Sequence, residues 1–176
     1  MAGIRPMVIM GVSGSGKTVL GQSLGKRLGI PFIDADDLHP ASNKALMAAG
    51  IPLTDADRVP WLNVVAATIA KGVSENQPGV VACSALKRTY RDLLRTLVPD
   101  LLLIYIDGAA EVIARRLEDR EHEYMPASLL ASQIATLEQP EADEAYIRVP
   151  AELTVEESAD LILGTLHLSL AAPRAD

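Results

Sequence analysis

Residues 8–18 read VIMGVSGSGKT, in which Gly11, four further residues, Gly16, Lys17 and Thr18 have the spacing of a phosphate-binding loop. Glycine lets the backbone curl so that successive amide N–H groups point toward an anion. A helix that starts near Lys17 adds its positive N-terminal end. The pattern therefore predicts a site for a nucleoside triphosphate, and a glycine-rich turn that binds nothing is the alternative.

Within this loop, each residue type has its own expected use. The Lys17 ammonium group can reach the β- and γ-phosphates, and the Thr18 hydroxyl can ligate Mg²⁺. The residues expected to contact the nucleotide are Gly11, Ser13, Gly14, Ser15, Gly16, Lys17 and Thr18.

Three carboxylates crowd into residues 32–40, which read FIDADDLHP. They follow a short apolar segment one βα unit after the loop, so in a parallel sheet they open at the same carboxyl edge as the phosphate site. We expect Asp34 to serve Mg²⁺ and Asp36 to accept the proton of an attacking hydroxyl, and the reverse assignment stays open. Asp37 is expected only to cap the next helix.

The remaining sequence narrows the class of nucleotide-binding protein. No D-x-x-G tetrapeptide of the kind that senses hydrolysis in GTPase switches occurs in the chain. At 176 residues, the chain is also short for a motor ATPase. Small proteins with this loop are most often kinases that act on metabolites.

Apolar runs alternate with helical patterns along the whole chain. Within each run, apolar and polar residues do not alternate, so both faces of the strands are expected to be covered, as in a parallel sheet. This predicts an α/β fold with a doubly wound, five-stranded parallel sheet and helices on both faces. The expected strands are 7–10, 31–33, 80–83, 101–106 and 145–149, and the expected helices are 17–28, 59–73, 87–98, 109–119, 126–138 and 154–170.

Length and composition indicate one domain, over residues 1–170, with a frayed tail at 171–176. The net charge of −7 argues against a nucleic-acid partner. No apolar run reaches the ~20 residues that span a bilayer, so no membrane partner is expected. The single cysteine, Cys83, suits a reducing cytoplasm and is expected in the core.

Three longer segments carry a family resemblance. They are DADDLHPASNKALMAAGIPLTDADRVPWL (34–62), CSALKRTYRDLLR (83–95) and YMPASLLASQIATLEQP (124–140). Together with the loop they closely resemble the bacterial-type gluconokinases, small kinases related to shikimate and nucleoside monophosphate kinases. The resemblance implies transfer of the γ-phosphoryl group of ATP to D-gluconate, with Mg²⁺, in a homodimer.

Gluconate is a polyol with one carboxylate, so its pocket needs a cation and several hydrogen-bonding groups. Arg58 offers a planar fork for the carboxylate, unless it forms an ion pair with Asp55 or Asp57. Lys87 and Arg91 are expected on one face of a helix, pointing at the substrate or the transferring phosphoryl group, with a solvated basic face as the alternative. The full set of expected substrate contacts is Asp36, His39, Arg58, Ser84, Lys87 and Arg91.

In the related kinases, the region that corresponds to residues 116–126 is a mobile lid. The resemblance implies that Arg120 closes over the phosphates, with Arg116 as the second candidate. The sequence departs from the family at Ala35, where glycine is usual, and at Glu123 and Tyr124, where the family reads His-Phe. These departures leave the loop and the acids in place.

Three other interpretations compete with a gluconokinase. Shikimate kinases share the D-x-D after the second strand, but they typically have three glycines where residues 83–85 read CSA. A nucleoside monophosphate kinase would need a pocket for a second base, which nothing obvious supplies. A non-catalytic nucleotide sensor is the alternative from another class.

Overall fold

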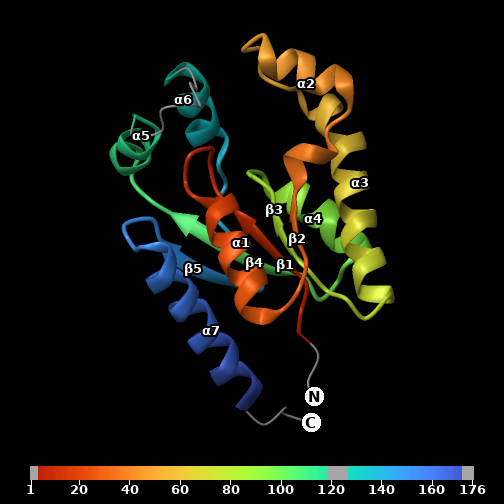
Figure 1. Ribbon diagram of the computed structural model, residues 1–176. Helices are drawn as coiled ribbons and strands as arrows, with labels where there is room; N and C mark the ends of the chain where they lie inside the picture. The colour runs from red at the N-terminus through yellow and green to blue at the C-terminus, as the bar shows by residue number, and fades with distance from the viewer. Residues whose placement is uncertain (1–3, 119–126, 172–176) are drawn as a thin grey trace.

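A parallel sheet forms the centre of the computed structural model, which describes residues 4–118 and 127–171. Its strands are β1 (Met7–Met10), β2 (Phe32–Asp34), β3 (Val80–Ala82), β4 (Leu102–Asp107) and β5 (Tyr146–Pro150). Their order is β2-β3-β1-β4-β5, and every neighbouring pair is parallel. The predicted doubly wound, five-stranded α/β sheet is therefore confirmed (Figure 1).

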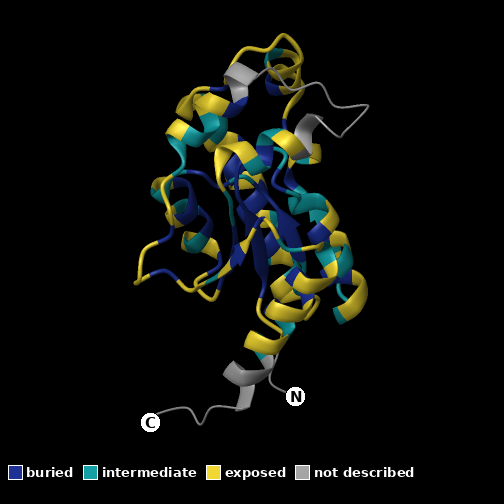
Figure 2. Ribbon diagram, turned by 90° about the vertical axis from the view of Figure 1, so that its left-hand side faces the viewer, coloured by how far each residue is buried: buried dark blue, intermediate teal, exposed yellow. Residues whose placement is uncertain are grey.

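Helices cover both faces of this sheet. They are α1 (Lys17–Leu28), the short 3₁₀ helix η1 (Ala35–Leu38), α2 (Ala41–Ala48), α3 (Asp55–Ser74), α4 (Arg88–Leu97), α5 (Ala110–Glu118), α6 (Ala127–Thr136) and α7 (Val155–Ala171). Helices α3 and α4 pack on one face, and α1 and α7 pack on the other. Figure 2 shows the buried strands enclosed between helices whose outer surfaces are exposed.

Strand β1 shows why the apolar runs do not alternate. Val8 and Met10 belong to the core under α3 and α4, whereas Met7 and Ile9 belong to the core under α1 and α7. All four side chains are fully buried. Because a central strand has two buried faces, a continuous apolar run is what this position requires.

Helix α3 begins earlier than the sequence predicted. The expected start was residue 59, since Pro60 favours an early helical position, but the helix starts at Asp55. Thr54 caps it: the Thr54 hydroxyl accepts a hydrogen bond from the backbone of Asp57, whose side chain accepts one from the backbone of Thr54. This capping box satisfies the first amide groups of the helix, so Pro60 lies inside it.

Within the described residues, no helix is both long enough and apolar enough to cross a membrane.

Candidate active site

The loop between β1 and α1 has a backbone that requires glycine. Gly11, Gly14 and Gly16 have φ angles of 146°, 79° and 100°, which other residues rarely adopt. A Cβ on Gly11 would lie 3.0 Å from Ser15 Oγ and 3.1 Å from the carbonyl oxygen of Ile106. The amide of Gly11 also donates a hydrogen bond of 3.3 Å to the carbonyl of Ser84, which joins the loop to the end of β3.

Lys17 and Thr18 occupy the first turn of α1, at the positive end of the helix. Lys17 folds back over the loop, where its Nζ donates to the Val12 carbonyl at 2.9 Å. Thr18 Oγ1 donates to Asp34 Oδ2, also at 2.9 Å. The sequence predicted that the loop and the acids share one edge of the sheet, and this bond places them in contact.

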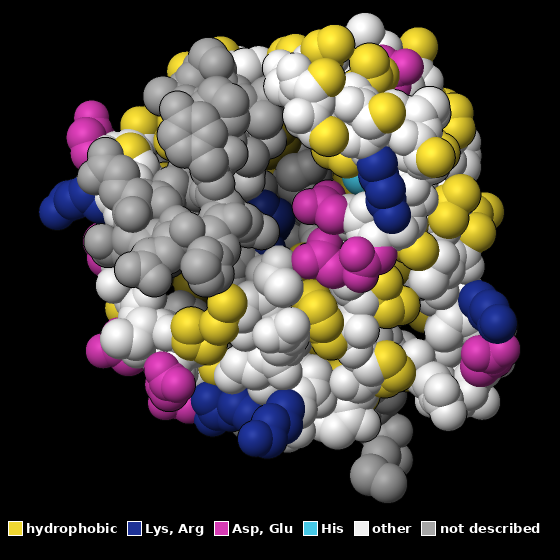
Figure 3. All heavy atoms as spheres, turned by 45° about the horizontal axis from the view of Figure 1, so that its top comes forward, with side chains coloured by type: hydrophobic (Ala, Val, Ile, Leu, Met, Phe, Trp, Pro, Cys, Tyr) yellow, Lys and Arg dark blue, Asp and Glu magenta, His cyan; other side chains and the backbone are white. Residues whose placement is uncertain are grey.

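The three carboxylates lie at the end of β2 and in η1 (the acid turn, residues 34–37). Asp34 Oδ1 accepts a hydrogen bond of 3.1 Å from the amide of Asp36, so Asp34 caps the turn. The expectation that Asp37 caps the next helix is wrong, because α2 starts at Ala41 after Pro40 with no side-chain cap. Figure 3 shows acidic and basic side chains gathered around the hollowed middle of this face.

Trp61 and His39 form the wall behind the acid turn. Trp61 is 2% exposed, and its Nε1 donates to the Ala35 carbonyl at 2.7 Å, which holds the turn against α3. The rings of His39 and Trp61 stack with centroids 4.0 Å apart and an interplanar angle of 15°. Burial, helped by the positive charges of Arg58 and Lys44, lowers the pKa of His39 to about 4. The imidazole is therefore neutral near pH 7.

Basic side chains lie at the start of α3 and of α4. Arg58 Nη1 donates to the Leu53 carbonyl at 2.5 Å, and its guanidinium lies 5.8 Å from the centre of the Tyr90 ring. The alternative partners of Arg58 are engaged elsewhere, since Asp57 completes the capping box and Asp55 accepts from Lys87 Nζ at 2.8 Å and from the Tyr90 hydroxyl. Lys87, at the N-terminus of α4, is thus paired with the exposed carboxylate of Asp55, the first residue of α3.

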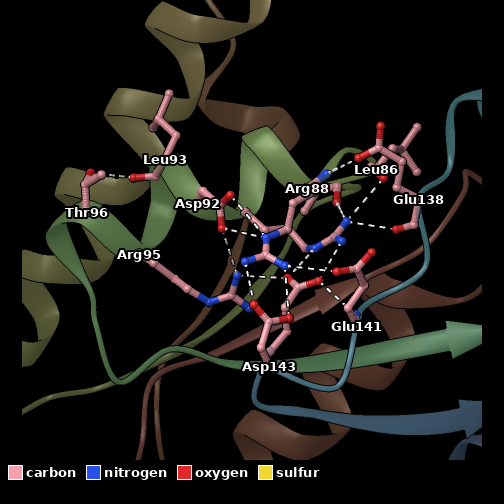
Figure 4. A network of polar contacts seen from close by, with 12 residues as sticks. Leu86, Arg88, Asp92, Leu93, Arg95, Thr96, Glu138, Glu141 and Asp143 are labelled. Carbon is pink, nitrogen blue, oxygen red and sulfur yellow. Dashed lines mark hydrogen bonds and ion pairs between the residues drawn. The ribbon is translucent and has the colours of Figure 1, made fainter.

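Arg91 requires a correction, because its side chain cannot reach a substrate as predicted. It is fully buried, and its Nε and Nη2 each donate to Glu144 at 2.8 Å. Its remaining nitrogen donates to the carbonyls of Ala85, Leu86 and Glu138. Figure 4 shows the surrounding network of ion pairs, which joins α4 to residues 138–144. Arg91 is a structural residue that anchors this segment.

Ser84 is the second residue after β3 and lies beside the phosphate loop. Its side chain is half-buried, and its carbonyl accepts the hydrogen bond from Gly11 described above. The next residue, Ala85, has a φ of 43°, in the left-handed region that favours glycine. The backbone therefore turns sharply at Ala85, next to the phosphate loop.

A cavity of about 280 Å³ adjoins the other side of the loop. Gly14 and Gly16 line it together with Ile106, with Val149 and Pro150 at the end of β5, and with Ala151, Leu153 and Thr154 just after that strand. A larger hollow of about 880 Å³ lies at the opposite edge of the sheet, where Pro6, Pro31 and Pro78 precede three strands. Its lining includes no residue of the phosphate loop.

Two polar side chains at the site escaped the sequence analysis. Gln133 of α6 accepts a hydrogen bond of 2.6 Å from the amide of Ser13 in the loop. Asn43 of α2 is 4% exposed and contacts His39. Both belong to the segments that carry the family resemblance, and that position was the one signal the sequence offered. Their burial, which marks them as hydrogen-bonded, is visible only in the structure.

The predicted lid lies largely outside the described residues. Arg120 belongs to the undescribed part of the chain, and for Arg116 only a backbone position in α5 is described.

The residues around the loop fit a bound magnesium ion. Mg²⁺ is commonly held by one or two protein oxygens together with substrate phosphates. The Thr18 hydroxyl and the Asp34 carboxylate lie within hydrogen-bond distance of each other, beside the amides of the phosphate loop. These two residues would hold the ion.

Comparison with known sequences points to one family. A family model described as an AAA domain matches residues 7–140. The gluconokinase of Gluconobacter oxydans (strain 621H) is 47% identical over 152 residues, which are 85% of each chain. The thermosensitive gluconokinase of Escherichia coli (strain K12) is 45% identical over 147 residues, 84% of this chain and 78% of the relative.

Solved structures agree with the sequences. A sugar kinase from Janibacter sp. HTCC2649 has a TM-score of 0.88 at 44% identity, over 95% of this chain and 96% of that one. A gluconokinase from Sinorhizobium meliloti 1021 has a TM-score of 0.85 at 38% identity, over 96% and 98% of the two chains. A shikimate kinase from Bacteroides thetaiotaomicron, at 16% identity and a TM-score of 0.61, shares the fold alone. This chain, with its phosphate loop in contact with an acid turn, belongs to the gluconokinase family of ATP-dependent kinases.

Proposed function

We propose that this protein transfers the γ-phosphoryl group of ATP to the 6-hydroxyl of D-gluconate, giving 6-phospho-D-gluconate and ADP. The observation that carries the proposal is the 2.9 Å hydrogen bond between Thr18 and Asp34, which joins a triphosphate site to a set of carboxylates. Proteins named gluconokinase, at 45–47% identity over most of the chain, support gluconate as the acceptor.

In the proposed reaction, the amides of the phosphate loop and Lys17 hold the triphosphate. The oxygen of the 6-hydroxyl bonds to the γ-phosphorus while the bond from that phosphorus to the bridging oxygen of ADP breaks. Asp36 accepts the proton of the hydroxyl in this step. A magnesium ion held by Thr18 and Asp34 supplies charge stabilisation at the phosphate oxygens when bound. Asp36 is suited to its role because its side chain is 75% exposed at the mouth of the site.

The nucleoside of ATP and the carboxylate of gluconate each have a proposed position. The 280 Å³ cavity between Gly14–Gly16 and residues 149–154 supports a position for the nucleoside, since it continues from the phosphate loop. Arg58 is the proposed partner of the gluconate carboxylate, and His39, Ser84 and Lys87 are further proposed contacts of the substrate. Arg120 and Arg116 remain the proposed arginines of the lid. A homodimer is proposed from the resemblance alone, and a cytoplasmic location is proposed from the single cysteine.

Identification of the product tests the proposal. The protein is incubated with Mg·ATP and uniformly ¹³C-labelled D-gluconate, and the product is analysed by ¹³C and ³¹P NMR. Phosphorus coupling at carbon 6 is the expected result. A phosphate at any other carbon would contradict the placement of the 6-hydroxyl at Asp36, and no phosphorylated gluconate at all would contradict the substrate.

A further inference from the structure

Asn43 lies behind His39, on the side of the ring away from the acid turn. Its Nδ2 donates a hydrogen bond of 2.9 Å to the carbonyl of Asp57, an acceptor that cannot donate in return. This bond fixes which end of the Asn43 amide is the NH₂ group. The same nitrogen lies 3.2 Å from His39 Nδ1. Since an NH₂ group carries two hydrogens, the second one points at Nδ1.

The donor from Asn43 determines the tautomer of His39. A neutral imidazole has one N–H and one acceptor nitrogen, and the nitrogen that accepts cannot carry the proton. Because Nδ1 accepts from Asn43, the ring proton is placed on Nε2. The ring is 7% exposed and held flat against Trp61, so it cannot flip to exchange the two nitrogens without leaving the core.

His39 Nε2 faces the carboxylate of Asp36, with 4.0 Å between Nε2 and Oδ1. This separation is too long for a direct hydrogen bond. It does fit a hydroxyl oxygen that lies about 2.8 Å from both atoms, with about 90° between the two bonds. Such a hydroxyl accepts a hydrogen bond from Nε2–H and donates one to Asp36. These two bonds use the single donor of the hydroxyl and one of its two acceptor positions.

We propose that Asn43 is a positioning residue that fixes His39 in the Nε2–H form, so that His39 and Asp36 together bind one hydroxyl of the acceptor substrate. The arrangement makes His39 a donor and leaves Asp36 as the acceptor of the hydroxyl proton. The lowered pKa of His39 agrees with this, because a neutral ring has only one donor to give. The inference rests on the proposed function only for the identity of the hydroxyl as part of a polyol.

The tautomer is measured directly in the whole protein. Long-range ¹H–¹⁵N correlation spectra of ¹⁵N-labelled protein distinguish a protonated from an unprotonated ring nitrogen, and the His39→Gln variant assigns the signal among the three histidines. We expect a protonated Nε2 and an unprotonated Nδ1 near pH 7. A protonated Nδ1 in the wild-type protein would overturn the proposal without any use of activity.

The role of Asn43 is tested with Asn43→Asp, which has the same shape but accepts instead of donating. We expect the ring proton to move to Nδ1, and the KM for D-gluconate to rise about tenfold while the KM for ATP stays constant. Asn63→Asp, which makes the same change at an exposed position of α3, should alter neither. An unchanged Nε2–H signal in Asn43→Asp would show that Asn43 does not set the tautomer.

Asn43→Leu provides the second variant if Asn43→Asp does not fold. It removes both donated hydrogen bonds without offering an acceptor, so the ring should populate both tautomers and the KM for gluconate should again rise. A single Nε2–H form with an unchanged KM for gluconate would overturn the role of Asn43. If wild-type protein does not phosphorylate gluconate but shows the expected tautomer, the proposed function alone fails.

Discussion

Thr18 and Asp34 are joined by a 2.9 Å hydrogen bond that runs from the first turn of α1 to the end of β2. The two residues are 16 positions apart in the chain. Thr18 belongs to the part of the site expected to bind the triphosphate, and Asp34 to the part expected to accept the proton. Thr18 follows the lysine of the phosphate loop, and Asp34 caps the turn that carries Asp36. A shift of either element would therefore change the distance between the triphosphate and the proton acceptor.

Replacing Asp36 by Asn tests the proton acceptor. The amide keeps the shape of the side chain but cannot take up a proton, so kcat should fall by about 10²–10⁴ while the Kd for ATP is preserved. Turnover is measured by ADP release, and ATP binding by calorimetry. Asp37→Asn is the matched control, and its kcat should stay near that of the wild type. A larger loss in Asp37→Asn than in Asp36→Asn would contradict the assignment.

Replacing Thr18 by Val removes the hydroxyl at nearly constant volume. The variant loses the bond to Asp34 and one proposed magnesium ligand, so kcat/KM for Mg·ATP should fall by at least about tenfold. Thr68→Val, which removes a hydroxyl bonded to the Val64 carbonyl on an exposed helix face, should have no kinetic effect. Equal activities of the two variants, measured over a range of Mg²⁺ concentrations, would rule out a role for the Thr18 hydroxyl.

Arg58→Lys keeps the positive charge but loses the planar fork of donors. If Arg58 binds the carboxylate of gluconate, the KM for gluconate should rise about tenfold or more, with little change for ATP. Arg27→Lys, at an exposed ion pair with Asp160, controls for loss of a guanidinium group. A KM for gluconate unchanged in Arg58→Lys would move the carboxylate to another residue.

The buried pair of Arg91 and Glu144 should affect stability and not binding. Arg91→Met removes two charge-assisted hydrogen bonds from the buried Glu144 carboxylate, which keeps those from Arg95 and from the Glu141 amide. The free energy of unfolding should therefore fall by about 3–5 kcal/mol in urea titrations. The double variant Arg91→Met, Glu144→Met should recover much of this loss. If the single variant were as stable as the wild type but raised the KM for gluconate, Arg91 would be a substrate contact after all.

The lowered pKa of His39 predicts that the free energy of unfolding depends on pH. Its pKa in the folded protein, about 4, lies below the ordinary value of 6.5, so folding favours the neutral ring. The stabilisation is complete above pH 6.5 and is lost as the pH falls toward 4. Urea titrations of wild type and His39→Gln should therefore diverge across this window. Parallel stability curves for the two proteins would contradict a buried, neutral His39.

Short sequence patterns predicted those parts of the fold that are determined by residues close together in the chain. The glycine spacing fixed the loop and the start of α1 at Lys17, and continuous apolar runs identified the strands because both faces of the sheet are covered. Cys83, which directly follows β3, is 1% exposed, as expected for a small core residue. Each of these features follows from neighbouring residues in the chain.

The sequence could not predict partners that are distant in the chain. Helical spacing placed Lys87 and Arg91 on one face, but the partner of Arg91 is Glu144, 53 residues later. Asn43 and Asp57 likewise come together only when α2 packs against the start of α3. Asp34 rather than Asp37 caps a turn because β2 ends in a 3₁₀ helix that no periodicity announced.

The most direct test of a phosphoryl-transfer site at the loop and acid turn is ADP release from Mg·ATP with different acceptors. The panel contains D-gluconate, shikimate, AMP and neutral sugars, with ATP alone as the blank. Turnover with gluconate, and with no other acceptor, is the predicted result. Turnover only with another acceptor would contradict the substrate but not the site. Tight ATP binding without turnover on any acceptor would contradict catalysis itself and favour a nucleotide sensor.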